Sequence, residues 1–333
     1  MSEGVDIRAE VAKLARLIGV ERDELEFLEK MSSDTLRELR GQLVELFFDD
    51  NNESLRRFAH AGNLLPTSVA ASLTKQAVGP VLAARIAGLV EPRQSVAMTA
   101  RLPIDFVTDI TVEIDPRRVE AVIALMPQKI VAQVADELIA RREYVTMGQL
   151  IGFVDEFTMA TTISRAGDED ILLTGFVVED KSRLSPALEL LDDDRLFGLM
   201  YTAGEQHLWP EALDLIRHLD EEQFCRIAEQ ASQLEDEMLD ELIEVAHTDE
   251  LWYVALPAVA RMSDPTHAIA ALLRAGAAAI KSFADAISDG NDWEDARALL
   301  ERVHNEQRAE LRKRFAKNGR LAQLEPVAEL LEP

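Results

Sequence analysis

Few residues of this chain have types and spacings suited to catalysis or metal binding. Its histidines are His60, His207, His218, His247, His267 and His304, and no two are four residues apart, the spacing that places two imidazoles on one helix face. The motifs HExxH, GxSxG and GxGxxG and the glycine-rich phosphate-binding loop are missing. The sequence therefore favours a protein without enzymatic activity. An enzyme, or a carrier of apolar ligands, whose site is assembled from scattered residues stays open as an alternative.

Two residues of reactive types have structural interpretations. The only cysteine, Cys225, lies beside Phe224 on an amphipathic stretch, which predicts a buried structural thiol. His247 is followed closely by Asp249 and Glu250, but a histidine near the end of a helix more often complements the helix dipole. Neither residue predicts a catalytic site.

Carboxylate clusters are the remaining candidates for metal binding. The first cluster is Asp192, Asp193 and Asp194, in a predicted loop, and a second runs over 235–241 on one helix. Oxygen ligands of this kind suit Mg²⁺ or Ca²⁺, although neither cluster has the spacing of a calcium-binding loop. Carboxylates at helix N-termini also cap free N–H groups, so a solvated acidic face is the favoured interpretation and metal binding the alternative.

A basic segment near the C-terminus contrasts with the acidic remainder of the chain. Its bases are Arg308, Arg312, Lys313, Arg314, Lys317 and Arg320, and Glu310 is the one acid among them. Nucleic-acid binding would call for interleaved aromatic residues, and only Phe315 is present. The segment is therefore expected to dock on the protein's own acidic surface or on an acidic protein partner.

Composition limits the class of protein. The chain has 333 residues, 61 acids against 35 bases and a formal net charge of −26, a field that repels nucleic acid and anionic membranes. Apolar residues make up 47% but aromatic residues only 5%, which favours helices over a β-sandwich or barrel. A single cysteine fits a reducing compartment, and charges interrupt the longest small-residue run, 268–287, so no membrane span is expected. A cytoplasmic location is expected.

A tandem repeat organises the chain. The segments 91–114 and 115–138 align over 24 residues, matching at Pro92/Pro116 and Pro103/Pro127 among other positions. With Pro80, the prolines recur every 11 to 13 residues. Proline suits the first turn of a helix and disfavours helix in the residue before it, so this spacing predicts a train of short helices. Repeats of this length must stack to bury their apolar faces.

One segment of the repeat carries a conflicting pattern. Residues 104–114 alternate apolar and polar side chains, as a strand does. Their repeat partner, 128–138, is rich in Ala, Gln, Glu and Leu and has helical spacing. Since the two units align, a helix is expected over 104–114.

The flanking regions suggest three parts. An N-terminal helical unit is expected over 1–62, a helical-repeat array over 63–247 and a C-terminal unit of longer helices over 248–333. In the last part the apolar patterns predict helices over 264–287 and 291–317, which would form a long closing hairpin.

The proline-punctuated stretch around 115–138 resembles the helical cytoplasmic N-terminal domain of MgtE-type magnesium transporters and the armadillo-like units of the flagellar motor switch protein FliG. Leu102-Pro103, Asp115-Pro116 and Met126-Pro127 match the dipeptides that open successive helices in those families, and the resemblance covers about residues 78–165. It implies an all-α fold, a right-handed superhelical array of armadillo or HEAT kind, with a longer helical hairpin at the C-terminus. No transmembrane helices, nucleotide-sensing domains or charged torque helix can be aligned, so the resemblance carries no site.

These observations predict a cytoplasmic helical-repeat scaffold or adaptor that binds a protein partner without catalysis. A regulator that responds to a divalent cation or a small ligand is the first alternative. No cofactor is predicted, Mg²⁺ or Ca²⁺ at Asp192–Asp194 is kept as a weaker alternative, and a homo-oligomer is compatible with the sequence.

Overall fold

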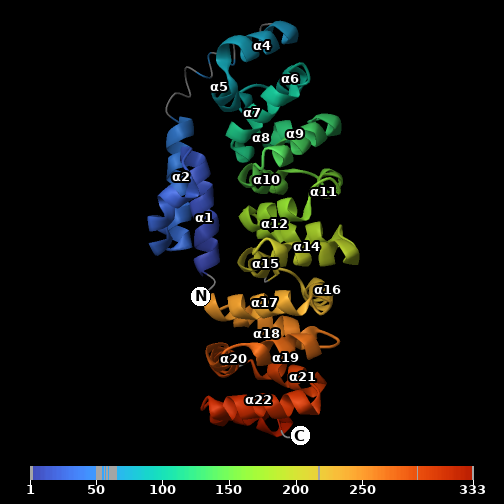
Figure 1. Cartoon of the computed structure of the whole chain (residues 1–333). Coiled ribbons are helices and arrows are strands. Elements are labelled where there is room, and N and C mark those ends of the chain that lie inside the picture. The colour runs from blue at the N-terminus through green and yellow to red at the C-terminus, as the bar shows by residue number, and fades with distance from the viewer. Residues whose placement is uncertain are drawn as a thin grey trace. The chain divides into compact units, whose positions relative to one another are not determined.

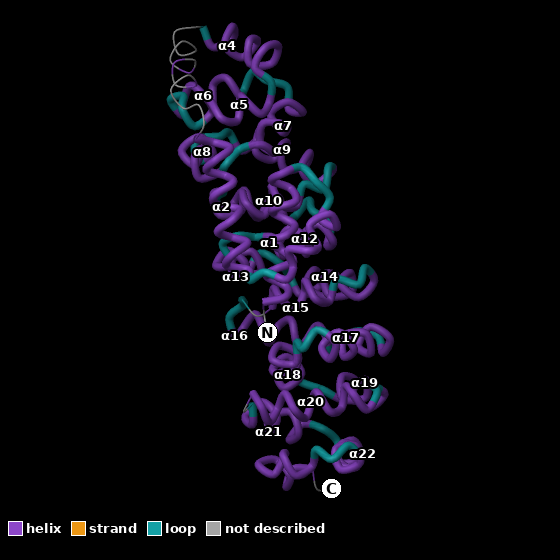
Figure 2. Tube along the Cα trace, turned by 90° about the vertical axis from the view of Figure 1, so that its left-hand side faces the viewer, coloured by secondary structure: helices purple, strands orange, loops and turns teal. Residues whose placement is uncertain are grey.

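The computed structural model describes residues 3–49, 55, 57, 59, 66–216, 218–290 and 292–331. The chain divides into two compact units, Glu3–Ala187 and Leu188–Pro333, called here the N-terminal and the C-terminal unit. All regular secondary structure of the described residues is helical, so the predicted all-α class is confirmed (Figures 1 and 2). The boundaries predicted after residues 62 and 247 stay predictions.

The N-terminal unit begins with a helical hairpin and continues as a series of short helices. The hairpin consists of α1 (Glu3–Ile18), the 3₁₀ segment η1 (Arg22–Lys30) and α2 (Ser33–Asp49). The series comprises α4 (Thr67–Leu73), the π-helical segment η2 (Thr74–Val78), α5 (Pro80–Ala87), α6 (Pro92–Thr99), α7 (Ile104–Glu113), α8 (Pro116–Ile123), α9 (Gln128–Ala140), α10 (Tyr144–Leu150), the 3₁₀ segment η3 (Ile151–Phe153), α11 (Glu156–Ile163) and α12 (Asp168–Val177). The 3₁₀ segment η4 (Lys181–Arg183) and α13 (Leu184–Glu189) lead to the next unit.

The prolines begin these helices as expected. Pro80, Pro92 and Pro116 occupy the first turn of α5, α6 and α8, where their missing N–H costs nothing. Pro103 and Pro127 directly precede α7 and α9. Each 24-residue unit therefore forms two helices.

The segment with the strand-like pattern is helical. It forms α7, in which Val107 and Thr108 are buried. The Thr108 hydroxyl donates to the Ile104 carbonyl (2.9 Å), so this polar side chain is satisfied inside the helix. The alternation is compatible with a helix because Val107 packs in one cluster with Val134 and Leu138 of α9. The prediction from repeat alignment is confirmed.

Helices of the series contact their next-but-one neighbours. Thus α4 packs on α6 and α6 on α8, while α5 packs on α7, α7 on α9 and α9 on α11 (Figure 1). The α1–α2 hairpin packs beside the series, mainly where α1 meets α10 and α12. Ala9 of α1 shares a small apolar cluster with Phe176 and Val177 of α12.

The C-terminal unit continues with short helices. These are α14 (Asp193–Glu205), α15 (Trp209–Ile216), α16 (Glu221–Ala231), α17 (Asp236–Thr248), α18 (Trp252–Arg261), α19 (Thr266–Arg274), α20 (Ala277–Gly290), α21 (Trp293–Arg302), α22 (Asn305–Lys317) and the 3₁₀ segment η5 (Leu321–Leu331). Next-but-one packing recurs here, with α14 on α16 and α16 on α18. Within the described parts of the chain, no helix is both long enough and apolar enough to span a lipid bilayer.

The long helices predicted over 264–287 and 291–317 are wrong, and with them the longer closing hairpin. Ala275 adopts an extended backbone (φ −60°, ψ 158°) between α19 and α20, so α17 packs on both helices. Val303 is likewise extended between α21 and α22, and its side chain is 2% exposed. At Val303, burial outweighs the helical propensity of the charged stretch, and at Ala275 the following Gly276, a poor helix former, ends the alanine-rich helix.

Candidate functional site

The predicted metal ligands Asp192–Asp194 lie at the N-terminus of α14. An oxygen of Asp192 accepts a hydrogen bond from the Arg195 backbone N–H (2.8 Å), which makes Asp192 the helix cap. Asp193 pairs with Arg226 of α16 (2.7 Å). Two of the three carboxylates therefore have structural partners. Across the described residues, no group of three or more His, Cys, Asp and Glu side chains is arranged to hold a metal ion.

The predicted partner-binding bases lie on and after α22, and most contact their own unit. Arg308 donates to the Leu330 carbonyl (3.3 Å), and Arg320 pairs with Asp285 of α20 (2.6 Å). Glu310 pairs with both Lys313 and Arg314, at 3.3 Å each. Arg312 is half-buried. Lys313 and Lys317 are the exposed members of the set, so they are the bases best placed to meet a partner.

The thiol and the histidine with a nearby carboxylate show no catalytic arrangement. Cys225 is half-buried on α16 and not fully buried as expected. His247 lies 2.7 Å from the Ser282 hydroxyl, which also accepts from the Trp252 indole N–H (2.9 Å). That hydroxyl is placed to donate its proton to the Ala279 carbonyl (3.1 Å). These contacts give the Ser282 hydroxyl a structural role, linking α20 to α17 and α18.

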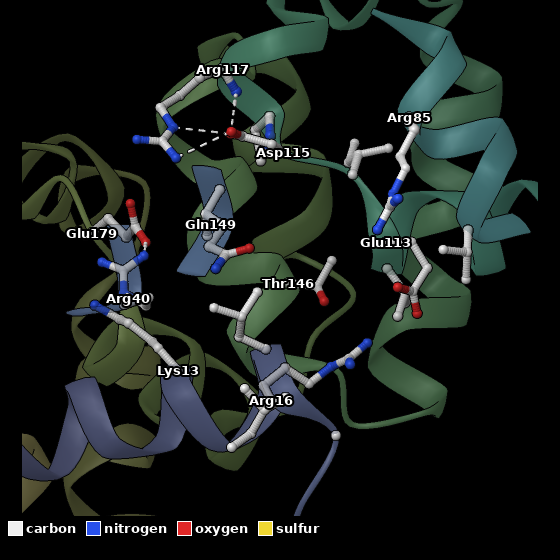
Figure 3. Close-up of a pocket in the computed structure, with 18 of the residues that line it drawn as sticks. Lys13, Arg16, Arg40, Arg85, Glu113, Asp115, Arg117, Thr146, Gln149 and Glu179 are labelled. Atoms are coloured by element: carbon white, nitrogen blue, oxygen red, sulfur yellow. Dashed lines mark hydrogen bonds and ion pairs between the residues drawn. The ribbon is translucent and has the colours of Figure 1, made fainter. Parts of the chain in front are cut away.

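A polar cavity lies within the N-terminal unit, between the α1–α2 hairpin and the helix series (Figure 3). Its cavity has a volume of about 390 Å³ and is called here the hairpin cavity. The hairpin contributes residues of α1 and α2, and α5, the α7–α8 turn, α10 and η3 form the opposite wall. Cationic side chains come from four helices and are Lys13, Arg16, Arg40, Arg85 and Arg117.

Ion pairs link the two walls of the hairpin cavity. Arg16 Nε of α1 lies 3.0 Å from Glu143 Oε2, at the start of α10. Arg40 Nη1 of α2 lies 2.6 Å from Glu179 Oε1, which follows α12. These charge-assisted contacts join the hairpin to the series beside the small apolar cluster of Ala9, Phe176 and Val177.

A buried carboxylate anchors the cations of the hairpin. Glu10 is 2% exposed and receives Lys13 Nζ at 3.1 Å and Arg40 Nε at 3.0 Å. Burial alone would raise the pKa of Glu10, but the charges and hydrogen bonds of Lys13 and Arg40 together lower it below its ordinary value. Glu10 is therefore ionised at neutral pH and fixes both cations at the edge of the cavity.

On the opposite wall, Asp115 holds Arg117 in a two-pronged pair. The guanidinium donates from Nε (3.0 Å) and Nη2 (3.1 Å), and the Arg117 backbone N–H donates to the same carboxylate (3.2 Å). Asp115 thus caps α8, and its hydrogen bond raises the pKa of Arg117. Asp115 and Arg117 belong to the Asp-Pro-Arg motif of the repeat. From the sequence, helix capping alone accounts for the aspartate of this motif.

The lining is suited to binding a polar molecule. Five cationic side chains and the carboxylates Glu113, Asp115 and Glu179 face the cavity, together with the polar side chains of Thr146 and Gln149 (Figure 3). The lining contains no His, Cys or Ser, so it offers neither a thiol nor a histidine-activated nucleophile.

The amino-acid sequence alone does not reveal this site. Its residues are spread from Lys13 to Glu179, and no local spacing connects them. The one local signal is Glu10 and Lys13, three residues apart beside the apolar stripe of Val11 and Leu14, where charges are unexpected unless paired. Comparison of the chain with protein-family models, curated proteins and solved structures finds no match.

Proposed function

We propose that this chain is a non-catalytic helical-repeat adaptor that binds a protein partner. The observation that carries the proposal is the next-but-one packing of short helices, which recurs in both units. Stacked helices of this kind present the outer faces of successive helices as one extended surface, the usual binding surface of repeat proteins.

The predicted right-handed superhelix is part of the same proposal. Support comes from the 24-residue units, each of which forms two helices opened by prolines, as the resemblance to the MgtE-type N-terminal domain and FliG implies. A cytoplasmic location is also proposed, since the single cysteine suits a reducing compartment.

Both apolar and positively charged side chains are exposed and available to a partner. Phe157 of α11 is 61% exposed, a large apolar surface for an unpartnered side chain. Lys313 and Lys317 of α22 project from an otherwise acidic chain. We propose that these lysines contact an acidic patch of the partner, since charge complementarity governs association of such surfaces.

Affinity purification tests the adaptor function. The full chain is used as bait in native lysate, enriched proteins are quantified by mass spectrometry, and each candidate is titrated in purified form by calorimetry. Lys317→Glu should weaken binding, whereas Lys281→Glu, a reversal at another exposed lysine of the same unit, should not. The adaptor function would be refuted if the chain enriched no protein reproducibly. It would also be refuted if none of the purified candidates bound.

The hairpin cavity favours a second function, a regulator that responds to a small ligand. A molecule bound there touches the α1–α2 hairpin on one side and α5, α8 and α10 on the other, so binding would hold the hairpin against the series. A thermal-shift screen with Mg²⁺, Ca²⁺ and metabolites tests this function, because a ligand at 100 times its Kd stabilises by about 2.7 kcal/mol. A flat screen would count against it.

A further inference from the structure

We propose that the hairpin cavity binds a small phosphorylated organic molecule. This inference rests on the second function above, the response to a ligand, and is independent of partner binding. It follows from the cations that line the cavity, their unused hydrogen-bond donors, and the size and mixed polarity of the space.

The first step is the supply of donors. Arg16 uses Nε for Glu143, and its two terminal nitrogens have no hydrogen-bond partner within the described residues. Arg117 uses Nε and Nη2 for Asp115 and keeps Nη1. Lys13 gives one of its three N–H bonds to Glu10. Donors are therefore left over on both walls, and the guanidinium group of Arg16 extends toward Glu113 in Figure 3.

The second step is the sign of the ligand's charge. Five cationic side chains line the cavity against three carboxylates, a difference of two positive charges. Glu10 and Glu143 behind them add two carboxylates, and Arg37 and Arg118, which pair with Glu10 and Asp115, add two cations, so the positive excess stays. On a chain of net charge −26, a cluster with more cations than carboxylates favours an anion over a cation.

The third step separates phosphate from carboxylate. The two oxygens of a carboxylate lie in one plane and match a single guanidinium fork, as Asp115 does with Arg117. A phosphate offers three terminal oxygens in different directions, so it can accept from cations of several helices together. In this cavity Arg16, Arg40 and Arg117 come from α1, α2 and α8, so their donors reach the space from different elements, which favours a ligand with oxygens in several directions over a planar carboxylate.

The fourth step is size. About 390 Å³ lies within the range of roughly 300–1,000 Å³ typical of small-molecule pockets and exceeds the volume of inorganic phosphate. Val81, Val112 and Phe153 supply apolar contact, and Gln149 supplies an amide that has no hydrogen-bond partner within the described residues. An organic group with hydroxyl or amide substituents, of the size of a pentose or a nucleoside, fits this mixture.

Calorimetry on the full chain, in metal-free buffer at fixed ionic strength, tests the inference. The probes are AMP and ribose 5-phosphate, with adenosine, ribose, inorganic phosphate and citrate for comparison. At least one phosphorylated probe should bind saturably, and its dephosphorylated form and citrate should bind at least about tenfold more weakly. A tenfold change corresponds to about 1.4 kcal/mol.

A matched pair of variants locates the binding. Gln149→Glu is nearly isosteric, adds a negative charge to the cavity wall and should weaken the phosphorylated probe at least about tenfold. Gln128→Glu makes the same change at an exposed position on α9 outside the cavity lining and should leave the affinity unchanged. Neither glutamine has a hydrogen bond to other described residues, so both variants should keep the wild-type melting temperature.

The outcomes separate the inference from the function on which it rests. The inference would be overturned if neither phosphorylated probe bound saturably. It would also be overturned if citrate bound equally well, or if the two variants had equal effects. If the metabolite screen found a ligand without a phosphate group and neither phosphorylated probe bound, the inference would fail. The proposed response to a small ligand would survive. If a phosphorylated probe bound without slowing hydrogen exchange in α1 and α2, the inference would stand and the regulatory function would fail.

Discussion

Replacing Glu10 by glutamine tests whether the buried ion cluster holds the α1–α2 hairpin. Glu10 is 2% exposed and is the carboxylate shared by Lys13 and Arg40. Removing one partner of a buried ion pair costs about 3–5 kcal/mol, because the other charge stays buried without compensation. Arg40 keeps Glu179, and glutamine retains one acceptor, so the lower figure of about 3 kcal/mol applies. For a unit of this size that loss lowers the melting temperature by roughly 6–12 °C.

Urea denaturation followed by far-ultraviolet circular dichroism measures the change, and hydrogen exchange of peptides from α1 locates it. Tryptophan fluorescence reports separately on the C-terminal unit, because Trp209, Trp252 and Trp293 all lie there. Asp34→Asn serves as the control, since the Asp34 side chain is 90% exposed and its pair with Arg37 should contribute less than about 1 kcal/mol. A loss below about 1 kcal/mol for Glu10→Gln would show that Lys13 and Arg40 reach water or another partner, and the reasoning would be refuted.

Three further predictions follow from burial and close contacts. The pKa of Glu10 is lowered in the folded protein, so its contribution is complete above its ordinary pKa of 4.5 and is lost as the pH falls through the folded value; the stability gap between wild type and Glu10→Gln should therefore be constant in urea titrations above pH 4.5 and shrink as the pH falls below it. Gly148→Ala should destabilise by about 1–3 kcal/mol in circular dichroism, since its Cβ would lie 3.0 Å from Val177, whereas Gly41→Ala, with open space around it, should be neutral or stabilising. Phe315→Ala should cost about 3–5 kcal/mol and lower the urea midpoint of tryptophan fluorescence, because its ring is 2% exposed in the C-terminal core.

Local rules in the sequence predicted where helices begin better than where they end. Prolines and acidic residues mark starts because each has a physical effect on the first turn, and Asp155, Asp192 and Asp220 all accept hydrogen bonds from backbone N–H groups as helix caps. The turns at Ala275 and Val303 carry neither a proline nor an acidic cap, although Gly276 and Glu306 lie beside them. They exist because helices on both sides gain burial by folding back, a benefit that depends on distant residues.

The hairpin cavity lay outside the reach of sequence patterns for a related reason. Its two walls come from segments separated by tens of residues, and the contact of α1 with α10 and α12 depends on packing that no periodicity encodes. Arg117 was visible as part of the repeat and Lys13 as part of a helix, but each has an adequate local explanation. Only their common position around one cavity suggests binding.

Part of the acidity of the sequence is used by the fold. Asp193 pairs with Arg226 across 33 residues, and Asp240 pairs with Arg274 across 34, so carboxylates join a helix to one further along the stack. Carboxylates with such partners are poorly disposed to bind a free cation, because binding would remove the partner's counter-charge. The distinctive electrostatic feature is instead the gathering of cations in the hairpin cavity, where donors remain unused. A search for the physiological ligand should therefore begin with anions, and Mg²⁺ or Ca²⁺ belongs among the comparisons.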